Sequence, residues 1–313
     1  MTDDKSKLAA QEAQFRQAAE QGDAEAQFEL AKIYKSPYCH WEDRKKRKAE
    51  ALRWFRKAAE QDHVEAQYWT GVYYLFGLEV VTKDQAEANA WFRKAAEQGH
   101  TGAMMKLGRY REAAELGDAY AQYYLGNQCK EENPNEAMNW YLTATNNADG
   151  LDGRASTAGK AAYQIAKLYE EGNGVPKDEK TALAWLIKAA EKGDPEAPWV
   201  IARRYAKGLG VPKDTKVAAI WYVEAESRDA DFEADGRDLK QDCKARGIPL
   251  EEMLVAYRKA AETCDVWAMY LADVYKYGWG LRPDEAESQK WRRKAAEGFS
   301  GHLTDVETEG GMH

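Results

Sequence analysis

Proline and cysteine are both scarce in this chain, which has 8 prolines and 4 cysteines among 313 residues. Few prolines leave few helix breaks, and residues that favour helix, chiefly alanine, glutamate and lysine, dominate the composition. Cys39, Cys129, Cys243 and Cys264 form neither a CxxC pair nor a repeating pair. We therefore expect a helical protein with reduced thiols in the cytoplasm, unless a signal segment was removed before this numbering begins.

Long apolar runs are absent as well. No segment approaches the roughly 20 apolar residues that span a bilayer, and the first residues, MTDDKSKLAAQEAQF, lack the apolar core of a signal peptide. The formal net charge is −8, and an acidic surface repels nucleic acids and anionic membranes. The sequence thus predicts a soluble protein with no membrane span and no nucleic-acid partner, although a local basic stripe stays compatible with it.

One tripeptide recurs along most of the chain. Ala-Ala-Glu occurs at 18–20, 58–60, 95–97, 113–115, 189–191, 260–262 and 295–297. Degenerate copies are Thr143-Ala144-Thr145 and Glu224-Ala225-Glu226. The typical interval is roughly 36 residues, which is the length of one helical hairpin in a repeat array. The sequence therefore predicts an all-α solenoid of antiparallel helix pairs, with about seven or eight units, some of them degenerate.

Each unit has two halves. The first half reads Ala-Gln-x-x-Leu-Gly-x-x-Tyr, in variants such as 66–74 and 197–205, and its offsets 0, 4, 5 and 8 share one side of a helix. A glycine-rich stop follows at 172–176 and 208–212, where proline prevents continuation. The second half begins at a capping residue seven positions before a tryptophan: Asp84, Asn133, Asp178, Asp214 and Asp284. Six tryptophans in that second half are expected to be core: Trp54, Trp91, Trp140, Trp185, Trp221 and Trp291.

These segments resemble the Sel-1-like repeat family, a relative of the tetratricopeptide repeats. The resemblance rests on WFRKAAEQDHVEAQYWTGVYYLFG at 54–77 and WLIKAAEKGDPEAPWVIARRYAKGLGVPKD at 185–214, and it covers roughly residues 10 to 300. It implies a right-handed superhelix whose first helices, the A helices, line a concave face. It also implies an adaptor in signalling, secretion, envelope regulation or host contact. We expect one solenoid over 1–300 and a flexible tail over 301–313.

The array is irregular in several places. Residues 98–115 are too short for a full unit and predict either one continuous helix or a shortened hairpin. Residues 146–159 have the composition of a loop, flexible or partner-binding, and the A-helix motif is barely recognisable in 227–249. The long first turn holds Cys39, His40 and Trp41 before a basic run at 44–48. A solvated helix start explains it better than a zinc site or a nuclear-type signal.

No catalytic constellation is visible. His63 and His100 occupy the same repeat slot, which favours a structural role for both. The glycine-rich turns follow helices and not strands, which excludes a dinucleotide site. We predict no enzymatic activity, no cofactor and no metal. The alternative is an enzyme or small-ligand binder of the same family that uses the irregular middle section.

The partner site is predicted on the concave face. Offsets 3 and 6 from the template alanine of each A helix point away from the core at ~100° per residue, and five of these positions are basic while one is acidic. The predicted site residues are Trp69, Tyr73, Lys106, Arg109, Tyr124, Asn127, Lys167 and Arg203. Trp69 and Tyr124 would anchor a protein or peptide, acidic or phosphorylated, against the competing interpretation of ordinary solvated helix residues. By the resemblance to the Sel-1-like repeats, the expected protein is a bacterial interaction scaffold with a regulatory, secretion-linked or toxin-neutralising role.

Overall fold

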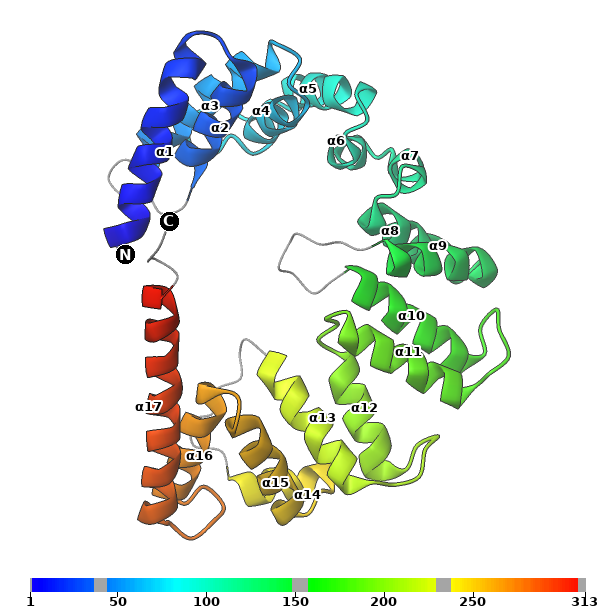
Figure 1. Cartoon of the computed structure of the whole chain (residues 1–313). Coiled ribbons are helices and arrows are strands. Elements are labelled where there is room, and N and C mark those ends of the chain that lie inside the picture. The colour runs from blue at the N-terminus through cyan, green and yellow to red at the C-terminus, as the bar shows by residue number, and fades with distance from the viewer. Residues whose placement is uncertain (1, 37–43, 148–156, 229–237, 309–313) are drawn as a thin grey trace. The chain divides into compact units, whose positions relative to one another are not determined.

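The computed structural model describes residues 2–36, 44–147, 157–228 and 238–308 (Figure 1). Within these ranges the chain forms seventeen helices and no strand, which confirms the predicted all-α fold. The chain divides into two compact units, unit 1 over Met1–Gln128 and unit 2 over Cys129–His313. This division falls inside the region for which the sequence predicts a single array.

Unit 1 alternates the two helix types that the repeat predicts. The helices α2, α4 and α6 each pack against the helix that precedes and the helix that follows, for example α2 against α1 and α3. The B helices are α1 (Thr2–Glu20), α3 (Arg44–Ala59), α5 (Gln85–Glu97) and α7 (Tyr110–Glu115). The A helices are α2 (Ala24–Lys35), α4 (Val64–Phe76), α6 (Thr101–Lys106) and α8 (Ala119–Cys129).

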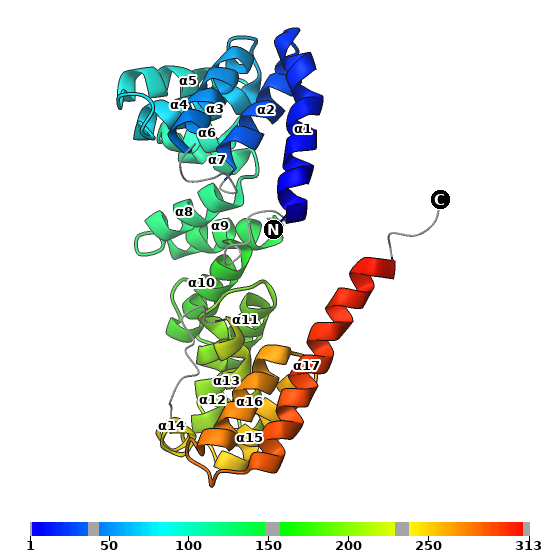
Figure 2. The same ribbon diagram turned by 90° about the vertical axis from the view of Figure 1, so that its left-hand side faces the viewer.

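Unit 2 continues the alternation. Its last two helices, α16 and α17, pack side by side (Figure 2). The B helices are α9 (Pro134–Asn146), α11 (Glu179–Glu191), α13 (Thr215–Arg228), α15 (Leu250–Ala261) and α17 (Glu285–Thr308). The A helices are α10 (Thr157–Glu171), α12 (Ala197–Lys207) and α16 (Asp265–Tyr277), and the short α14 (Leu239–Arg246) lies within the degenerate segment.

The predicted capping residues begin the B helices. Asp84 Oδ1 accepts hydrogen bonds from the backbone N–H groups of Ala86 and Glu87, at 2.9 and 3.0 Å. Asp178 and Asp214 cap α11 and α13 in the same way. Because these side chains satisfy donors that the first turn leaves unpaired, a local sequence signal fixes where each B helix starts.

The repeated alanines form the contact surface between helices. Ala58, Ala95 and Ala189, all in Ala-Ala-Glu copies, are completely buried. A methyl group lets two helix backbones approach closely, which explains why this tripeptide recurs. The tryptophans behave less uniformly. Trp54, Trp91 and Trp291 are buried as predicted, whereas Trp140, Trp185 and Trp221 are only half-buried and pack at the edge of the core.

The irregular segments are now defined. Residues 98–115 form a shortened hairpin, because Gly108, with φ 76°, separates α6 from α7. Most of the predicted loop 146–159 lies outside the described residues, although α10 already begins at Thr157. At the other end α17 continues to Thr308, where the sequence predicts a flexible tail, and residues 309–313 lie outside the described ranges.

The cysteines are not paired in the part of the chain that is described. Cys129, Cys243 and Cys264 are free thiols, and Cys39, His40 and Trp41 lie outside the described residues. Burial raises the pKa of Cys243 to about 11, so this thiol is a packing group of unit 2. Among the helices described, none is long and apolar enough to cross a membrane.

One glycine is required by close backbone packing in unit 2. A Cβ atom on Gly159 of α10 would lie 2.7 Å from the Asp194 backbone nitrogen and 2.9 Å from the Lys192 carbonyl oxygen. These backbone atoms belong to the turn between α11 and α12 and cannot rotate away. We expect Gly159→Ala to lower the free energy of unfolding by about 1–3 kcal/mol, measured by urea denaturation. Lys160→Ala, at the next and exposed position, should change it little, and equal stability of the two variants would refute this packing.

Candidate interaction surface

The outward side of the A helices is set by helix geometry. With Ala66 of α4 as the template alanine, the core offsets leave offsets −1, 3, 6 and 10 on the opposite side at ~100° per residue. We call this side the A face. In α4 it holds Glu65, Trp69, Val72 and Phe76. Phe76 is 50% exposed, Trp69 is half-buried, and Val72 is buried. The A face of this helix therefore reaches the surface at Phe76 and Trp69, whereas other side chains cover it at Val72, at offset 6.

Aromatic rings and lysine ammonium groups alternate on the A face of unit 1. Lys35 Nζ lies 3.1 Å from the centre of the Trp69 ring, and Lys106 Nζ lies 6.0 Å from the centre of the Phe76 ring. Trp69 also packs edge-on against Tyr68, with ring centres 5.6 Å apart. Burial is the largest effect that lowers the pKa of Lys35, followed by the neighbouring charge of Lys32. An amine held over a ring in this way keeps its hydrogen-bond donors for other groups.

His63 and His100 are structural, as their shared repeat slot predicts. His100 Nδ1 accepts a hydrogen bond from the Ala103 backbone N–H at 3.1 Å, and its ring stacks on Tyr68 with centres 4.4 Å apart. His63 makes the same contacts one repeat earlier: its Nδ1 accepts a hydrogen bond from the Ala66 backbone N–H, and its ring stacks on Phe28. Because each Nδ1 accepts, the neutral ring carries its proton on Nε2, which lies 3.3 Å from Glu65 in His100. Each histidine therefore caps an A helix and joins two neighbouring repeats of unit 1.

The basic charge predicted for the groove is partly neutralised nearby. Arg109 donates two hydrogen bonds to Glu112, at 2.8 and 2.5 Å, and Lys32 pairs with Glu29 at 2.6 Å. Glu65 also lies on the A face, at an offset that the sequence-based charge count omits. The A face of unit 1 is therefore mixed in charge, and the predicted excess of basic residues does not describe it.

One predicted site residue is wrong. Tyr73 is only 1% exposed, and burial raises the pKa of its hydroxyl to about 12. Its position, seven residues after Ala66, turns it toward Phe55 of α3, whose ring centre is 6.0 Å away. Tyr73 is a core residue and cannot contact a partner.

The other predicted residues of unit 1 lie on α8. Tyr124 stacks on Tyr110 of α7 with ring centres 4.0 Å apart, and Asn127 is half-buried. Their neighbour Tyr120, which the sequence analysis did not select, is 54% exposed on the same face. Its offset of −1 is the signal that would have found it.

Unit 2 carries the two remaining predicted residues. Lys167 Nζ lies 4.9 Å from the Tyr163 ring centre, and Arg203 is exposed. The next residue, Arg204, is buried and pairs with Glu170. On α16, Leu271 and Tyr275 match the template when Trp267 takes the position of the template alanine, and the A face then holds Val266 and Tyr277, which are 72% and 55% exposed. The predicted residues that reach the surface belong to A faces of both units.

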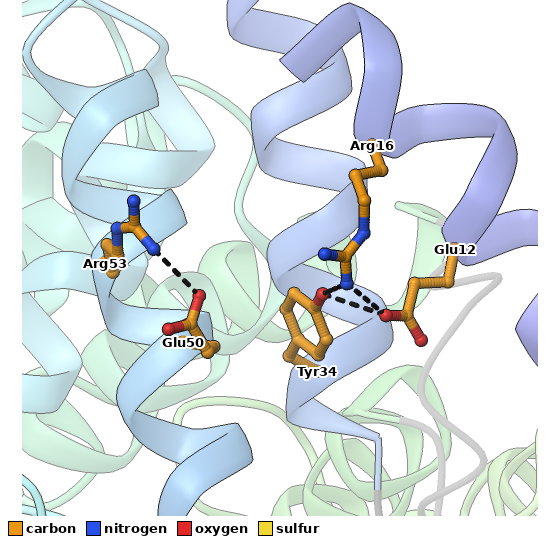
Figure 3. A network of polar contacts seen from close by, with 5 residues as sticks. All are labelled: Glu12, Arg16, Tyr34, Glu50 and Arg53. Atoms are coloured by element: carbon orange, nitrogen blue, oxygen red, sulfur yellow. Dashed lines mark hydrogen bonds and ion pairs between the residues drawn. The ribbon is translucent and has the colours of Figure 1, made fainter. Parts of the chain in front are cut away.

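A polar cleft between α1, α2 and α3 escaped the sequence analysis (Figure 3). Its volume is about 520 Å³. Arg16 Nη2 donates to Glu12 and to the Tyr34 hydroxyl, both at 2.6 Å, and the hydroxyl donates to Glu12 at 2.9 Å. Burial, and then the hydrogen bond to Glu12, raise the pKa of Tyr34 to about 12. The lining residues are Glu12, Arg16, Glu20, Tyr34, Lys46, Arg47, Glu50, Arg53, Trp54 and Lys57.

The family profile of the Sel1 repeat matches residues 24–63, 64–100, 119–149, 159–194, 196–229 and 268–298. The chain belongs to the Sel1 repeat family. The matched segments coincide with the A and B helix pairs, and the unmatched stretches hold the shortened hairpin of α6 and α7 and the degenerate segment around α14. Sel1 repeats generally serve as scaffolds for protein–protein interaction.

A solved structure supports the fold. A protective antigen present in uropathogenic Escherichia coli strains, described as displaying an SLR fold, is 26% identical, with a TM-score of 0.57. The match covers 91% of this chain and 64% of that chain, so the Sel1 repeats described here span less than two thirds of that relative. A Sel1 repeat protein from Oxalobacter formigenes is also 26% identical, over 88% of this chain and 89% of that chain, with a TM-score of 0.38. Among curated proteins, none matches this chain.

Proposed function

We propose that this Sel1 repeat protein is a non-enzymatic interaction scaffold that binds a segment of a partner protein on its A faces. The observation that carries the proposal is that four of the nine exposed large apolar side chains in the described part of the chain lie on A faces. Phe76 and Tyr120 are exposed on the A face of unit 1, and Val266 and Tyr277 on that of unit 2. Exposed apolar groups rimmed by polar residues are characteristic of protein-binding surfaces.

The charges beside these groups favour a partner that combines apolar and acidic side chains. In unit 1 the amines of Lys35 and Lys106 lie over aromatic rings, where they can also receive a carboxylate or a phosphate. Trp69 and Phe76 offer apolar surface next to them, and a buried aromatic anchor with a charged rim is the usual anatomy of an interface. Such a surface would serve a regulatory, a secretion-linked or a toxin-neutralising protein in a bacterial cytoplasm.

A paired substitution tests the A face directly. Phe76→Glu combined with Lys106→Glu should reduce capture of the partner from a lysate of the encoding organism by at least about tenfold, since each removes a distinct favourable contact. The measurement is quantitative mass spectrometry on the immobilised full chain. Both side chains are exposed, so the melting temperature should stay close to that of the wild type.

The matched control is Leu116→Glu combined with Lys94→Glu. Leu116 is an exposed apolar residue of the same unit, off the A helices, and Lys94 is an exposed lysine of α5. This variant carries the same change in charge and should retain the partner. If both variants lose the same proteins, or neither does, the A face is not the binding surface.

A further inference from the structure

Helix α3 is strongly basic in a chain that is acidic overall. Its sequence, RKKRKAEALRWFRKAA, has eight lysines and arginines and one glutamate, while the whole chain has a net charge of −8. A solvated helix start explains the run at 44–48, but not the later Arg53 and Lys57. These two side chains border the polar cleft between α1, α2 and α3 together with Lys46, and they also border a second cleft of about 350 Å³.

Four of the five cations that line the cleft fall into two groups. Arg16 is held by Glu12 and Tyr34, and Arg53 pairs with Glu50 at 3.3 Å. Among the described residues, Lys46 and Lys57 have no acidic partner; Lys57 Nζ lies 4.3 Å from the ring centre of Trp54. The contact of Arg16 with a tyrosine hydroxyl repeats in unit 2, where Arg258 donates to Tyr275. Lys46 and Lys57 are the two cations of the cleft that remain open to an acidic ligand.

We propose that the cleft between α1 and α3 is a second interaction surface, which binds an acidic segment of a protein. Lys46 and Lys57 would pair with carboxylates, while the ring of Trp54 and the hydroxyl of Tyr34 form the wall between them. The two lysines are eleven residues apart, or about 16 Å along the helix. That spacing suits two acidic side chains on an extended segment, because about five extended residues cover it.

The same geometry argues against a nucleic acid and against a lone phosphate. Glu12, Glu20 and Glu50 line the cleft as well, and they would repel a continuous phosphate backbone. A single phosphate reaches only one of the two lysines and leaves most of the volume empty. Apart from Tyr34 of α2, this surface is formed by the B helices α1 and α3, so it goes beyond the A-face binding proposed above and does not depend on it.

Binding of a fluorescein-labelled poly-L-glutamate peptide to the full chain, followed by fluorescence anisotropy, tests the proposal. The wild type should bind at low ionic strength and more weakly at about 0.15 M salt. Lys46→Glu combined with Lys57→Glu should weaken binding by at least about tenfold, because two attractive contacts become repulsive. Lys46→Gln with Lys57→Gln, which adds no acidic group, should weaken it in the same direction by a smaller factor.

The next repeat supplies the control. Lys83 and Lys94 follow Lys46 and Lys57 by 37 positions each, and Lys94 Nζ lies over Trp91 at 4.4 Å, as Lys57 does over Trp54. Lys83→Glu combined with Lys94→Glu should change binding by less than about twofold. The A-face variant, Phe76→Glu with Lys106→Glu, should also bind poly-L-glutamate like the wild type. The proposal for the cleft and the proposal for the A face are therefore tested independently.

Three results would overturn the proposal. The first is no binding of poly-L-glutamate at low salt, and the second is an equal loss in the Lys46/Lys57 and Lys83/Lys94 variants, which would mean unspecific attraction. The third is tighter binding of a DNA duplex, or displacement of the peptide by millimolar inorganic phosphate, with the same dependence on Lys46 and Lys57. That result would assign the cleft to phosphate groups instead of protein carboxylates.

Discussion

Glu226→Ala should lower the free energy of unfolding by about 3–5 kcal/mol, because it takes one of two carboxylate partners from a buried arginine and the acceptor from a buried tyrosine hydroxyl. Glu226 has no exposed side-chain surface, and Arg246 retains 11% of its own. Arg246 Nη2 lies 2.8 Å from Glu226 Oε1 and 2.6 Å from Asp242 Oδ2, and the Tyr257 hydroxyl donates to Glu226 at 2.7 Å. Removing the carboxylate therefore takes a partner from two buried groups at once.

The position of Glu226 in the repeat makes this effect specific. It is the last residue of a degenerate Ala-Ala-Glu copy, and the glutamates of the regular copies, such as Glu60, Glu97 and Glu191, are exposed. In the degenerate segment, Arg246 of α14 lies against this glutamate position of the repeat. Glu191→Ala should consequently change stability by less than about 0.5 kcal/mol, which makes it the matched control.

Burial is the dominant effect on this pair. It raises the pKa of Glu226 even though Arg246 lowers it, so the loss of hydration outweighs the attraction. A buried pair of this kind is often replaced by apolar residues without loss. Glu226→Leu combined with Arg246→Met should therefore be more stable than Glu226→Ala, in urea denaturation of the full chain followed by circular dichroism. If Glu226→Ala were as stable as the wild type, the pair of Glu226 and Arg246 would be solvated and not buried.

Signals within one turn of a helix were sufficient to predict much of this fold. Asp84 and Asn133 mark the starts of α5 and α9, because an N-cap acts on backbone donors two or three residues away. Glycine at the end of a helix is equally local, as Gly208 shows after α12. The repeat then multiplies each signal, so that even partial matches locate most helix pairs.

The candidate sites were harder to predict, since they depend on what covers each position. Val72 and Lys32 share offset 6, yet Val72 is buried and Lys32 is exposed. A single-helix projection cannot distinguish them, because the covering side chains come from other helices. The charge near these positions also depends on other helices: Glu112 of α7, which pairs with Arg109, lies outside the offsets that were counted. The network of Arg246 likewise joins residues separated by the irregular stretch, where the repeat pattern gives no register.

Trp91→Ala should destabilise unit 1 by about 3–5 kcal/mol, the range for truncating a buried aromatic side chain. Trp91 is buried in α5, its indole N–H donates to Glu87 at 2.9 Å, and Lys94 lies over its ring. Next to it Phe92 is fully buried, in a site so close that a Cβ on Gly71 would lie 2.7 Å from its ring. Because the neighbouring backbone is packed this closely, the space left by the indole cannot collapse.

The equivalent residue in unit 2 gives the comparison. Trp185 occupies the same repeat slot and carries Lys188 over its ring at 4.4 Å, yet it is only half-buried. Trp185→Ala should consequently cost clearly less than Trp91→Ala, because the area it removes from the core is smaller. Trp91→Phe, which keeps most of the apolar area, should fall between Trp91→Ala and the wild type. Equal losses at Trp91 and Trp185 in urea denaturation would mean that the repeat slot, and not the burial of each side chain, sets the stability.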